Sequence, residues 1–362
     1  MMRFRLEARP APAKPMLYLS PLLAVAASVV CAGLLFAALG RDPVQALSIL
    51  FIAPLSSVYS LTELALKATP LLLCAIGIAI GCRANVWNIG AEGQFTIGAI
   101  CGGGVGLAFG PGGGMWVLPA MLAAGIAGGA AWAAIPAFLR TRFNAHEILT
   151  TLMLSYVAIN LLGYLVHGPW RDPQGFNFPQ SKQFADAALL PLLVPGTRLT
   201  IAFLFALATV PLAAVLLGRT LAGFRIRVAG LAPGAARYAG FSANGTVWFT
   251  LLLSGALAGL AGVCEVAGPI GQLTPTISPG YGFAAIIVAF LGRLNPLGIL
   301  FASLLMALLY LGGEGLQMTL QLPLAVPGVV QGMLLFFLLG ADVFIHYRLR
   351  IVPAARKVLR DA

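Results

Sequence analysis

Charged residues are scarce in this sequence: they make up 9% of its 362 residues, whereas hydrophobic residues make up 60%. A soluble domain typically carries about 25% charged residues, which cover its surface in water. A fold in water would therefore lack polar surface here. The scarcity of charge excludes an ordinary soluble domain and predicts that lipid is the solvent for most of the chain.

The sequence also lacks the usual patterns of a chemical site. Its cysteines lie in or beside apolar segments, without the spacing of a metal or redox site. There is no G-x-x-x-x-G-K-[ST] phosphate cradle, and no Ser/His/Asp, zinc-type or paired-carboxylate arrangement. We therefore expect no catalytic residue, no metal and no cofactor bound by this chain. The five cysteines are Cys31, Cys74, Cys82, Cys101 and Cys264.

Long apolar runs take the place of polar surface. A helix needs about 20 predominantly apolar residues to cross a bilayer, and several runs approach or exceed that length. We predict an all-α, polytopic transmembrane bundle with about ten spanning helices. The runs cover residues 17–39, 61–82, 95–109, 115–139, 148–166, 199–217, 247–267, 283–291, 297–311 and 324–339.

Three of these runs are short for a full crossing: 95–109, 283–291 and 297–311. Non-helical backbone is tolerated at membrane depth only where it is buried in protein or borders a water-filled cavity. We expect some of the three runs to be broken helices or re-entrant segments of that kind.

The basic residues are distributed unevenly between the connections. If the N-terminus is cytoplasmic, 17 of the 22 Lys and Arg fall on the inner side, and only Arg41, Lys67, Arg171, Lys182 and Arg198 fall on the outer side. Cytoplasmic connections are enriched in Lys and Arg, so this bias predicts an N-in, C-in orientation with an even number of crossings. The net charge of +11 is then a topology signal, and we expect no nucleic acid partner.

Three glycine pairs inside the runs have the small-xxx-small spacing that lets helix backbones approach closely. We interpret them as generic tight packing and not as a specific dimer motif. They are Gly102/Gly106, Gly125/Gly129 and Gly255/Gly259.

Ionisable residues inside the runs are few. Glu63 and Lys67 stand four residues apart on one helix face, which favours a structural ion pair over a substrate contact. The runs carry none of the midplane carboxylates or histidines of a proton relay, so we expect the energy input in another chain.

The most unusual connection is residues 83–94, which joins two apolar runs with amides and glycines in place of the charges of an ordinary loop. Its glycines permit non-helical backbone. Asn85, Asn88, Glu92 and Gln94 supply hydrogen-bonding groups for the amides that such a backbone leaves free. The segment is interpreted either as a broken helix packed within protein or as the caps of two helices and nothing more.

Two other connections are polar enough to lie outside the membrane. Residues 168–198 form the longest polar stretch, on the outer side, and predict a small cap. Residues 219–245 lie on the inner side and are basic. Within them Pro233 begins and Gly240 ends a stretch of helix formers, which predicts a short amphipathic helix at the cytoplasmic face.

Four segments in one order resemble the permeases of bacterial ABC importers for nucleosides and simple sugars, the branched-chain amino acid and ribose type of permease. The most specific is 88–94, Asn-Ile-Gly-Ala-Glu-Gly-Gln, inside the irregular connection. The others are 178–181 in the outer connection, 234–240 in the inner one and 279–298 toward the C-terminus. Ala232 departs from the pattern, because the family often has Asn there.

The resemblance implies a type II ABC importer-like fold, in which residues 17–345 form the permease domain between cytoplasmic tails at 1–16 and 346–362. It implies three partner chains: a cytoplasmic ATPase that uses the ATP, a second permease, and an extracytoplasmic substrate-binding lipoprotein. The long basic N-terminus favours an unlike second permease over a second copy. The complex would sit in the bacterial inner membrane and import a nucleoside, a free base or a sugar, a choice that the sequence leaves open.

The resemblance also implies roles for individual residues. The expected residues of the translocation path are Asn85, Asn88, Glu92, Gln94, Tyr281 and Phe283. The expected residues of ATPase coupling, in the loop 219–245, are Pro233, Ala236, Arg237 and Tyr238. The expected residues of binding-protein docking, in the loop 168–198, are Pro179, Gln180 and Ser181.

Two other classes of protein compete with this interpretation: an ion-coupled secondary carrier or channel acting without an ATPase, and a membrane enzyme. The poverty of midplane ionisable residues argues against the carrier. The absence of a catalytic constellation argues against the enzyme. We therefore expect the chain itself not to be an enzyme.

Overall fold

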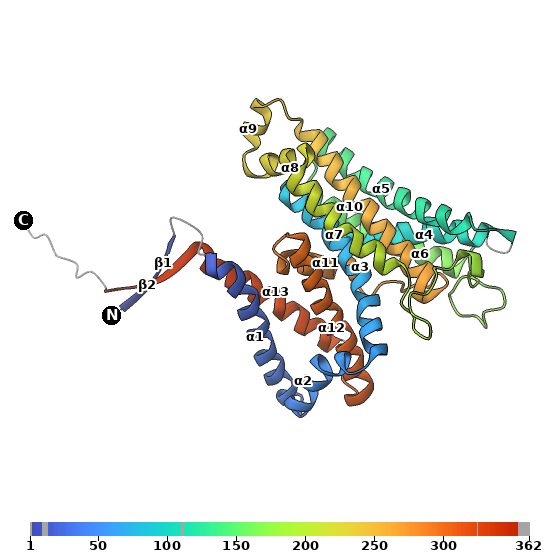
Figure 1. The fold of residues 1–362 in the computed structure, drawn as a ribbon, viewed down its shortest axis with the longest axis horizontal. Helices are drawn as coiled ribbons and strands as arrows, with labels where there is room; N and C mark the ends of the chain where they lie inside the picture. Colours follow the sequence, from blue (N-terminus) through green and yellow to red (C-terminus); the bar gives the residue numbers. More distant parts are fainter. Residues whose placement is uncertain (1, 9–13, 110–111, 324, 354–362) are drawn as a thin grey trace, which may run out of the picture. The chain divides into compact units, whose positions relative to one another are not determined.

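The computed structural model describes residues 2–8, 14–109, 112–323 and 325–353 (Figure 1). Contacts divide the chain into two units, which are described separately. The central unit is Ala53–Gly312, and the terminal unit combines Met1–Ile52 with Gly313–Ala362.

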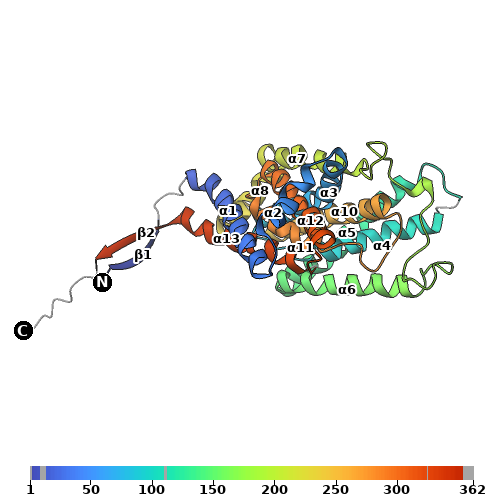
Figure 2. The same ribbon diagram turned by 90° about the horizontal axis from the view of Figure 1, so that it is seen from below.

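The central unit is a helical bundle in which α4, α5, α6, α7 and α10 run along a common direction (Figures 1 and 2). A π-helical turn, η4 (Val266–Ile270), continues α10. The main helices are α3 (Val58–Arg83), α4 (Ala91–Phe109), α5 (Val117–Phe143), α6 (Glu147–His167), α7 (Ala202–Arg219), α8 (Leu221–Leu231), α9 (Pro233–Tyr238), α10 (Ala243–Glu265), α11 (Tyr281–Leu291) and the first part of α12 (Pro296–Leu320). Short 3-10 turns lie at η1 (Ala53–Leu55) and η3 (Asp186–Ala188).

The terminal unit is built from α1 (Lys14–Ala38), which packs along α13 (Ala325–His346) and against α2 (Pro43–Phe51). Beyond these helices, β1 (Met2–Ala8) pairs antiparallel with β2 (Tyr347–Pro353). The prediction of an all-α chain with simple tails did not include this ribbon, because a hairpin made from the two ends of a chain leaves no local turn signal.

Six of the described helices are long and apolar enough to cross a membrane: α3, α5, α6, α7, α10 with the turn that follows it, and α12. This finding confirms a multi-pass membrane protein. The count of about ten crossings and the N-in, C-in orientation remain predictions.

The structure gives different outcomes for the three short runs. Run 297–311 lies inside the 25-residue α12, so the prediction that it is short was wrong. Run 95–109 belongs to the 19-residue α4. Run 283–291 forms most of α11, whose 11 residues extend only about 16 Å of the ~30 Å of a hydrocarbon core. Of the three, α11 is therefore the broken helix, and it follows an irregular segment at 271–280.

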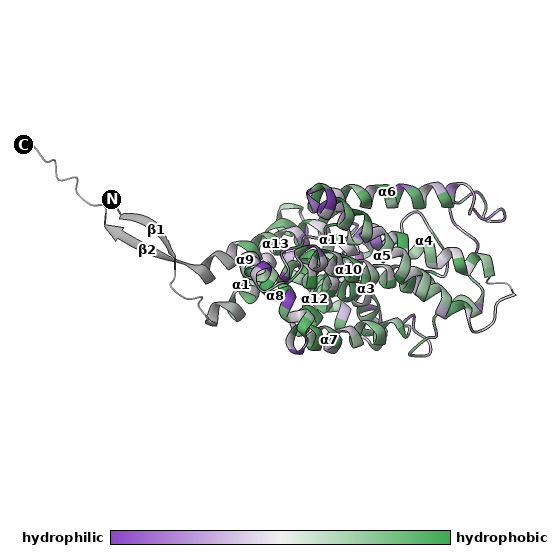
Figure 3. Ribbon diagram, turned by 90° about the horizontal axis from the view of Figure 1, so that it is seen from above, coloured by the Kyte–Doolittle hydropathy of each residue, from purple (hydrophilic) through white to green (hydrophobic). Residues whose placement is uncertain are grey.

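Burial differs sharply between the helices of the central unit. α3 is buried along most of its length, whereas α6 leaves large apolar side chains such as Met153, Tyr156 and Tyr164 exposed. Hydrophilic residues gather at the helix ends, as at both ends of α6 (Figure 3). An exposed apolar helix with polar ends fits a lipid surface around a buried α3.

Glycines set the spacing of the helices around α10. A Cβ added at Gly129 of α5 would lie 2.7 Å from the Cα of Gly259, and one added at Gly259 would overlap the carbonyl oxygen of Gly125. Gly98 of α4 meets the same Gly259. Three helix backbones therefore touch without side chains between them, which confirms the predicted tight packing.

Candidate functional site

The irregular connection begins where α3 ends. The amides of Ala84 and Val86 both donate to the carbonyl oxygen of Gly81, at 2.9 and 3.0 Å. Asn85 between them has a left-handed backbone conformation with φ 56°, which asparagine adopts more readily than most residues. Its side chain accepts a hydrogen bond of 3.3 Å from Nε1 of Trp87. This predicted path residue is exposed, at the turn itself.

The centre of the connection is a reciprocal pair of side-chain amides. Nδ2 of Asn88 donates to Oε1 of Gln94 at 2.8 Å, and Nε2 of Gln94 donates to Oδ1 of Asn88 at 3.1 Å. Nδ2 also donates to Oγ of Ser254 in α10 at 2.9 Å, and Oδ1 also accepts from the amide of Gly90. Asn88 is only 1% exposed. Its polar atoms are therefore fully engaged within the protein.

Hydroxyl groups of α6 satisfy the next backbone amides. Oγ1 of Thr151 accepts from the amide of Ile89 at 3.2 Å, and Oγ of Ser155 accepts from the amide of Gly93 at 3.3 Å. A Cβ added at Gly93 would lie 2.6 Å from the Cα of Ser155. The glycine therefore lets the start of α4 approach α6 closely enough for these bonds to form.

Glu92 joins the connection to α11. Its side chain is buried, with 4% of the residue exposed, and Oε2 accepts a hydrogen bond of 2.7 Å from the amide of Gly282. The carboxylate also hydrogen-bonds the side chain of Ser278 and the amide of Phe283. Oγ of Ser278 in turn accepts from the amide of Tyr281 at 2.9 Å. A carboxylate at this position is favourable because it faces the free amides and the positive dipole end of α11.

The two segments predicted to line the translocation path thus meet at Glu92. Tyr281 is buried, with its ring 6.4 Å from that of Phe95 and 5.5 Å from that of Tyr310. Phe283 is half-buried. We refer to residues 84–94 together with α11 as the joint. Asn88, Glu92, Gln94 and Tyr281 of the joint are buried, whereas Asn85 is exposed, and the role of these residues in lining a path stays a prediction.

A further set of contacts surrounds Trp87. Its ring stacks on that of Phe290 in α11, with 5.5 Å between centroids. Its amide lies 3.5 Å from Oε1 of Glu147. The same oxygen accepts a hydrogen bond of 2.6 Å from Nη1 of Arg140, in an ion pair. The start of α6 and the end of α5 are therefore tied to each other and to the joint.

The predicted helix of the inner loop is present as α9. Pro233 opens it, Ala236 faces inward and is buried, and Arg237 is exposed. Tyr238 is 98% exposed. Ala232 is at once the C-cap of α8 and the N-cap of α9, so the departure from Asn at this position has not removed the helix.

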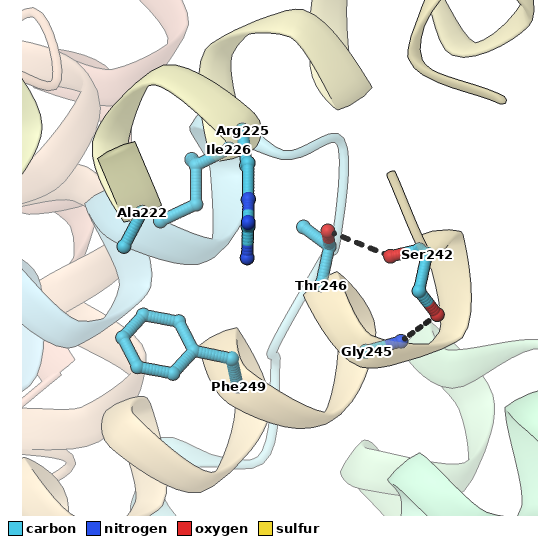
Figure 4. A pocket seen from close by; sticks show the side chains of 7 residues that line it. All are labelled: Ala222, Arg225, Ile226, Ser242, Gly245, Thr246 and Phe249. Atoms are coloured by element: carbon cyan, nitrogen blue, oxygen red, sulfur yellow. Dashed lines mark hydrogen bonds between the residues drawn. The ribbon is translucent and has the colours of Figure 1, made fainter. Parts of the chain in front are cut away.

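A cavity of about 230 Å³ lies between α8 and the first turns of α10 (Figure 4). The Arg225 side chain and the Phe249 ring face into it from α8 and α10, and Ser242 caps α10 by accepting from the amide of Gly245 at 3.0 Å. Arg225 also lies 5.4 Å from the ring centroid of Phe241. The surface beside α9 is therefore concave, basic and partly aromatic.

The outer loop 168–198 is anchored by the residues predicted to dock a binding protein. Ser181 is buried: its amide donates to the carbonyl of Leu273 at 2.9 Å, and its Oγ accepts from the amide of Leu273. Gln180 accepts from Nε2 of Gln272 at 3.2 Å. Pro179 is half-buried. Ser181 and Gln180 thus hold the outer loop against residues 272 and 273.

The outer loop is also bound to α3 through an ion pair. Arg198 donates two hydrogen bonds to the buried carboxylate of Glu63, one of them from Nε at 3.0 Å. Hydrogen bonding to Glu63 raises the pKa of Arg198 above its ordinary value. The predicted pair of Glu63 with Lys67 stays a prediction, and the structure adds to Glu63 a bidentate partner far away in sequence, which suits a planar guanidinium.

Several partners of the joint were not predicted. They are hydroxyls on other helices, Thr151, Ser155 and Ser254, and the side chain of Ser278 just before α11. Thr151 and Ser155 do stand four apart, on one face of a helix. A spacing of four residues between hydroxyl side chains is common in helices. It does not indicate which backbone amides pack against that face of the helix.

Comparison with known proteins gives one family for most of the chain. The family described as branched-chain amino acid transport system / permease component matches residues 60–339. The matched residues include the joint, α9 and the outer loop.

Curated relatives are similar over nearly their whole length. The glucose ABC transporter permease protein TsgB13 of Haloferax volcanii is 38% identical, over 92% of this chain and 90% of the relative. The nucleoside ABC transporter permease protein NupB of Lactococcus lactis is 30% identical, over 88% and 90%. The guanosine ABC transporter permease protein NupP of Bacillus subtilis is 28% identical, over 94% and 96%.

The contacts of Glu92 lead to a prediction about stability. Glu92→Ala would leave the amide of Gly282 buried without its acceptor, which costs about 1–3 kcal/mol. We expect faster amide hydrogen exchange in residues 280–285 and a lower unfolding temperature of the purified protein. Glu92→Gln keeps an acceptor oxygen and the side-chain shape, so its unfolding temperature should fall less than that of Glu92→Ala. Equal exchange rates in Glu92→Ala and the wild type would contradict this role.

Proposed function

This chain belongs to the family of branched-chain amino acid transport system permease components, and from that membership we propose that it is the permease subunit of an ATP-driven importer for a simple sugar or a nucleoside. It would provide part of the translocation path in a bacterial inner membrane, with a type II importer-like arrangement. ATP would be used by a separate ATPase subunit, and this chain would bind no cofactor.

One observation carries the proposal: the family match covers residues 60–339, which include almost the whole central unit with its joint. A broken helix whose free amides are satisfied by neighbouring helices is expected where a membrane protein places irregular backbone beside a transport path. The joint has that construction, in the segments that the sequence predicted for the path.

The class of substrate is proposed from the relatives and from the charges of the unit. The relatives named for glucose, nucleoside and guanosine share a sugar ring among their substrates. The buried carboxylates of Glu63 and Glu92 already have partners, in Arg198 and in the start of α11. This arrangement supports a neutral, hydroxyl-bearing solute over a charged one, because a charged solute needs a free counter-charge along its path.

The ATPase would dock on α9 and the concave surface beside it. Tyr238 and Arg237 project from α9 without packing against their own chain, and exposed Tyr and Arg residues are common anchors in protein interfaces. Pro233 and Ala236 would set the shape and position of the helix. The second permease, in preference an unlike chain, would complete the path.

The binding lipoprotein would dock on the outer loop. Its tip presents Phe176, which is 93% exposed, and Phe178, which is 66% exposed. Pro179, Gln180 and Ser181 would hold this tip in place from the base of the loop. Phe176 and Asn177 both have positive φ, at 47° and 71°, which fixes the tip in a conformation that few residues adopt freely.

The proposed function is tested by uptake. The chain would be reconstituted in proteoliposomes with its proposed partners, an ATPase, a second permease and a binding lipoprotein. We expect uptake of labelled glucose, ribose or guanosine that requires ATP and the lipoprotein, because energy and substrate capture lie in those partners. Uptake that persists without ATP and collapses with an ionophore would instead establish an ion-coupled carrier.

Docking of the ATPase is tested on α9. Arg237→Glu combined with Tyr238→Ala removes the proposed anchors, so we expect ATP-driven uptake to fall by about tenfold or more while the chain stays in the membrane. Arg142→Glu with Phe143→Ala is the matched control, an exposed Arg–aromatic pair at the end of α5. Unchanged transport in the α9 variant would refute the docking site.

Docking of the lipoprotein is tested at the loop tip. Phe176→Ser with Phe178→Ser removes both exposed rings, so we expect weaker capture of the substrate-loaded lipoprotein by the immobilised complex. Leu192→Ser is the control, since Leu192 is also exposed in the outer loop. Equal capture by the two variants would move the docking surface away from the tip.

A further inference from the structure

One backbone contact of the central unit is not used by the proposed function. Gly230 lies in the last turn of α8, where a Cβ would overlap the carbonyl oxygen of Arg83 and lie 3.0 Å from its carbonyl carbon. The backbone of α8 therefore rests directly on the end of α3, with no room for a side chain. Arg227, one turn earlier, lies close enough for its charge to repel that of Arg83.

α8 and the exposed helix α9 are separate helices joined directly at Ala232, which caps both. The amide of Ala232 donates to the carbonyl of Val228 at 2.9 Å, and the amide of Ala236 donates to the carbonyl of Ala232 at 3.0 Å. Hydrogen bonding thus runs through the residue that links the two helices. No flexible linker separates the two helices, and Gly230 is two residues before the link.

Arg83 carries the contact onward to the turn between α11 and α12. Its Nε donates to the carbonyl oxygen of Leu294 at 3.0 Å. Leu294 and Arg293 both have left-handed backbone, with φ 53° and 58°, and Asn85 at the start of the joint has φ 56°. Each such residue costs about 1 kcal/mol or more and persists only when its surroundings hold it. Arg83 lies between these strained turns and contributes to holding one of them.

Trp87 provides a second link between the end of α3 and α11. It lies four residues beyond Arg83, and its ring is stacked on Phe290 with an interplanar angle of 22°. The last turn of α11 thus contacts Trp87 through an aromatic pair. The turn that follows α11 contacts Arg83 through the hydrogen bond to Leu294.

We propose that Gly230 is a positioning residue through which movement of α9 reaches α11. The chain of contacts runs from α9 to α8, from Gly230 to the carbonyl of Arg83, and from Arg83 and Trp87 to Leu294 and Phe290. The inference rests on the proposed docking of an ATPase on α9, and it adds the route by which docking acts on the joint. A side chain at position 230 separates α8 from α3 and breaks this route.

The test uses the assembled complex labelled with fluorinated tryptophan, in nanodiscs for the spectra and in proteoliposomes for uptake. The chain has five tryptophans, and Trp87→Phe identifies the signal of Trp87. The variants are Gly230→Ala and Gly230→Val. The matched control is Gly218→Val in the last turn of α7, where a Cβ would meet nothing within 4 Å.

In the wild type and in Gly218→Val we expect Mg-ATP to shift the Trp87 signal. In Gly230→Val the ATPase still co-purifies, but the shift is lost and uptake falls by about tenfold, a typical size for a broken coupling. Gly230→Ala should lie between them, because its side chain is smaller.

Three results would overturn the inference. One is an ATP-dependent Trp87 shift and normal uptake in Gly230→Val. Another is loss of the ATPase from that variant, which would make Gly230 part of the docking surface. The third is absence of both Gly230 variants from the membrane, which would make the contact purely structural. If the wild type itself shows no ATP-dependent uptake, the proposed function fails instead.

Discussion

A backbone that leaves its helix inside a membrane protein must find a hydrogen-bond partner for every amide that it frees, because no bulk water is available. In this chain the requirement is met by side chains from several helices at one place. Asn88 and Gln94 bond each other and Ser254, while Glu92 receives the first amides of α11. Each lost partner would cost about 1–3 kcal/mol. The positions of α4, α6, α10 and α11 are consequently fixed relative to one another.

Glycine makes that arrangement geometrically possible. Hydrogen bonds of about 3 Å between neighbouring helices require backbones closer than two side chains would allow. A Cβ at Gly282 would lie 2.5 Å from the Cα of Glu92, and a Cβ at Gly77 would lie 2.9 Å from the Cα of Ser254. The abundance of glycine therefore serves the hydrogen bonding of buried polar groups as well as close helix packing. A membrane unit without these glycines would have to keep its helices unbroken.

Sequence patterns predicted the features that depend on local chemistry. Apolar length indicated a membrane protein, Pro233 marked the start of α9, and the amides of 85–94 left a buried break and simple helix caps as the two alternatives. They did not predict partners that the fold brings together across long separations. Ser254 meets Asn88 across 166 residues, and Arg198 meets Glu63 across 135. Helical spacing pointed only to Lys67 for Glu63 and could not find Arg198, because spacing describes only one helix at a time.

The length of one predicted helix, run 297–311, was also wrong, because hydropathy alone defined its end. The predicted run 297–311 ends at Leu311, just before two glycines and Glu314. The helix α12 nevertheless continues through Gly313 to Leu320. A Cβ at Gly313 would lie 2.6 Å from the ring of Pro327, so α12 and α13 pack closely at this glycine. Tertiary packing thus overrides a weak local preference of about 1 kcal/mol. The extent of a spanning helix depends on such neighbours as much as on its own residues.

The contacts at both ends of α11 restrict how the joint can change shape. Its first turn is bonded to Glu92 and Ser278, and near its last turn Phe290 stacks on Trp87. A change of conformation that keeps these contacts must move α11 and residues 84–94 together as one body. The bending then falls on the irregular segment 271–280, where the backbone already departs from regular structure. The short helix and residues 84–94 therefore form one hydrogen-bonded and stacked body, and the irregular segment before α11 is the part of its surroundings with the least regular backbone.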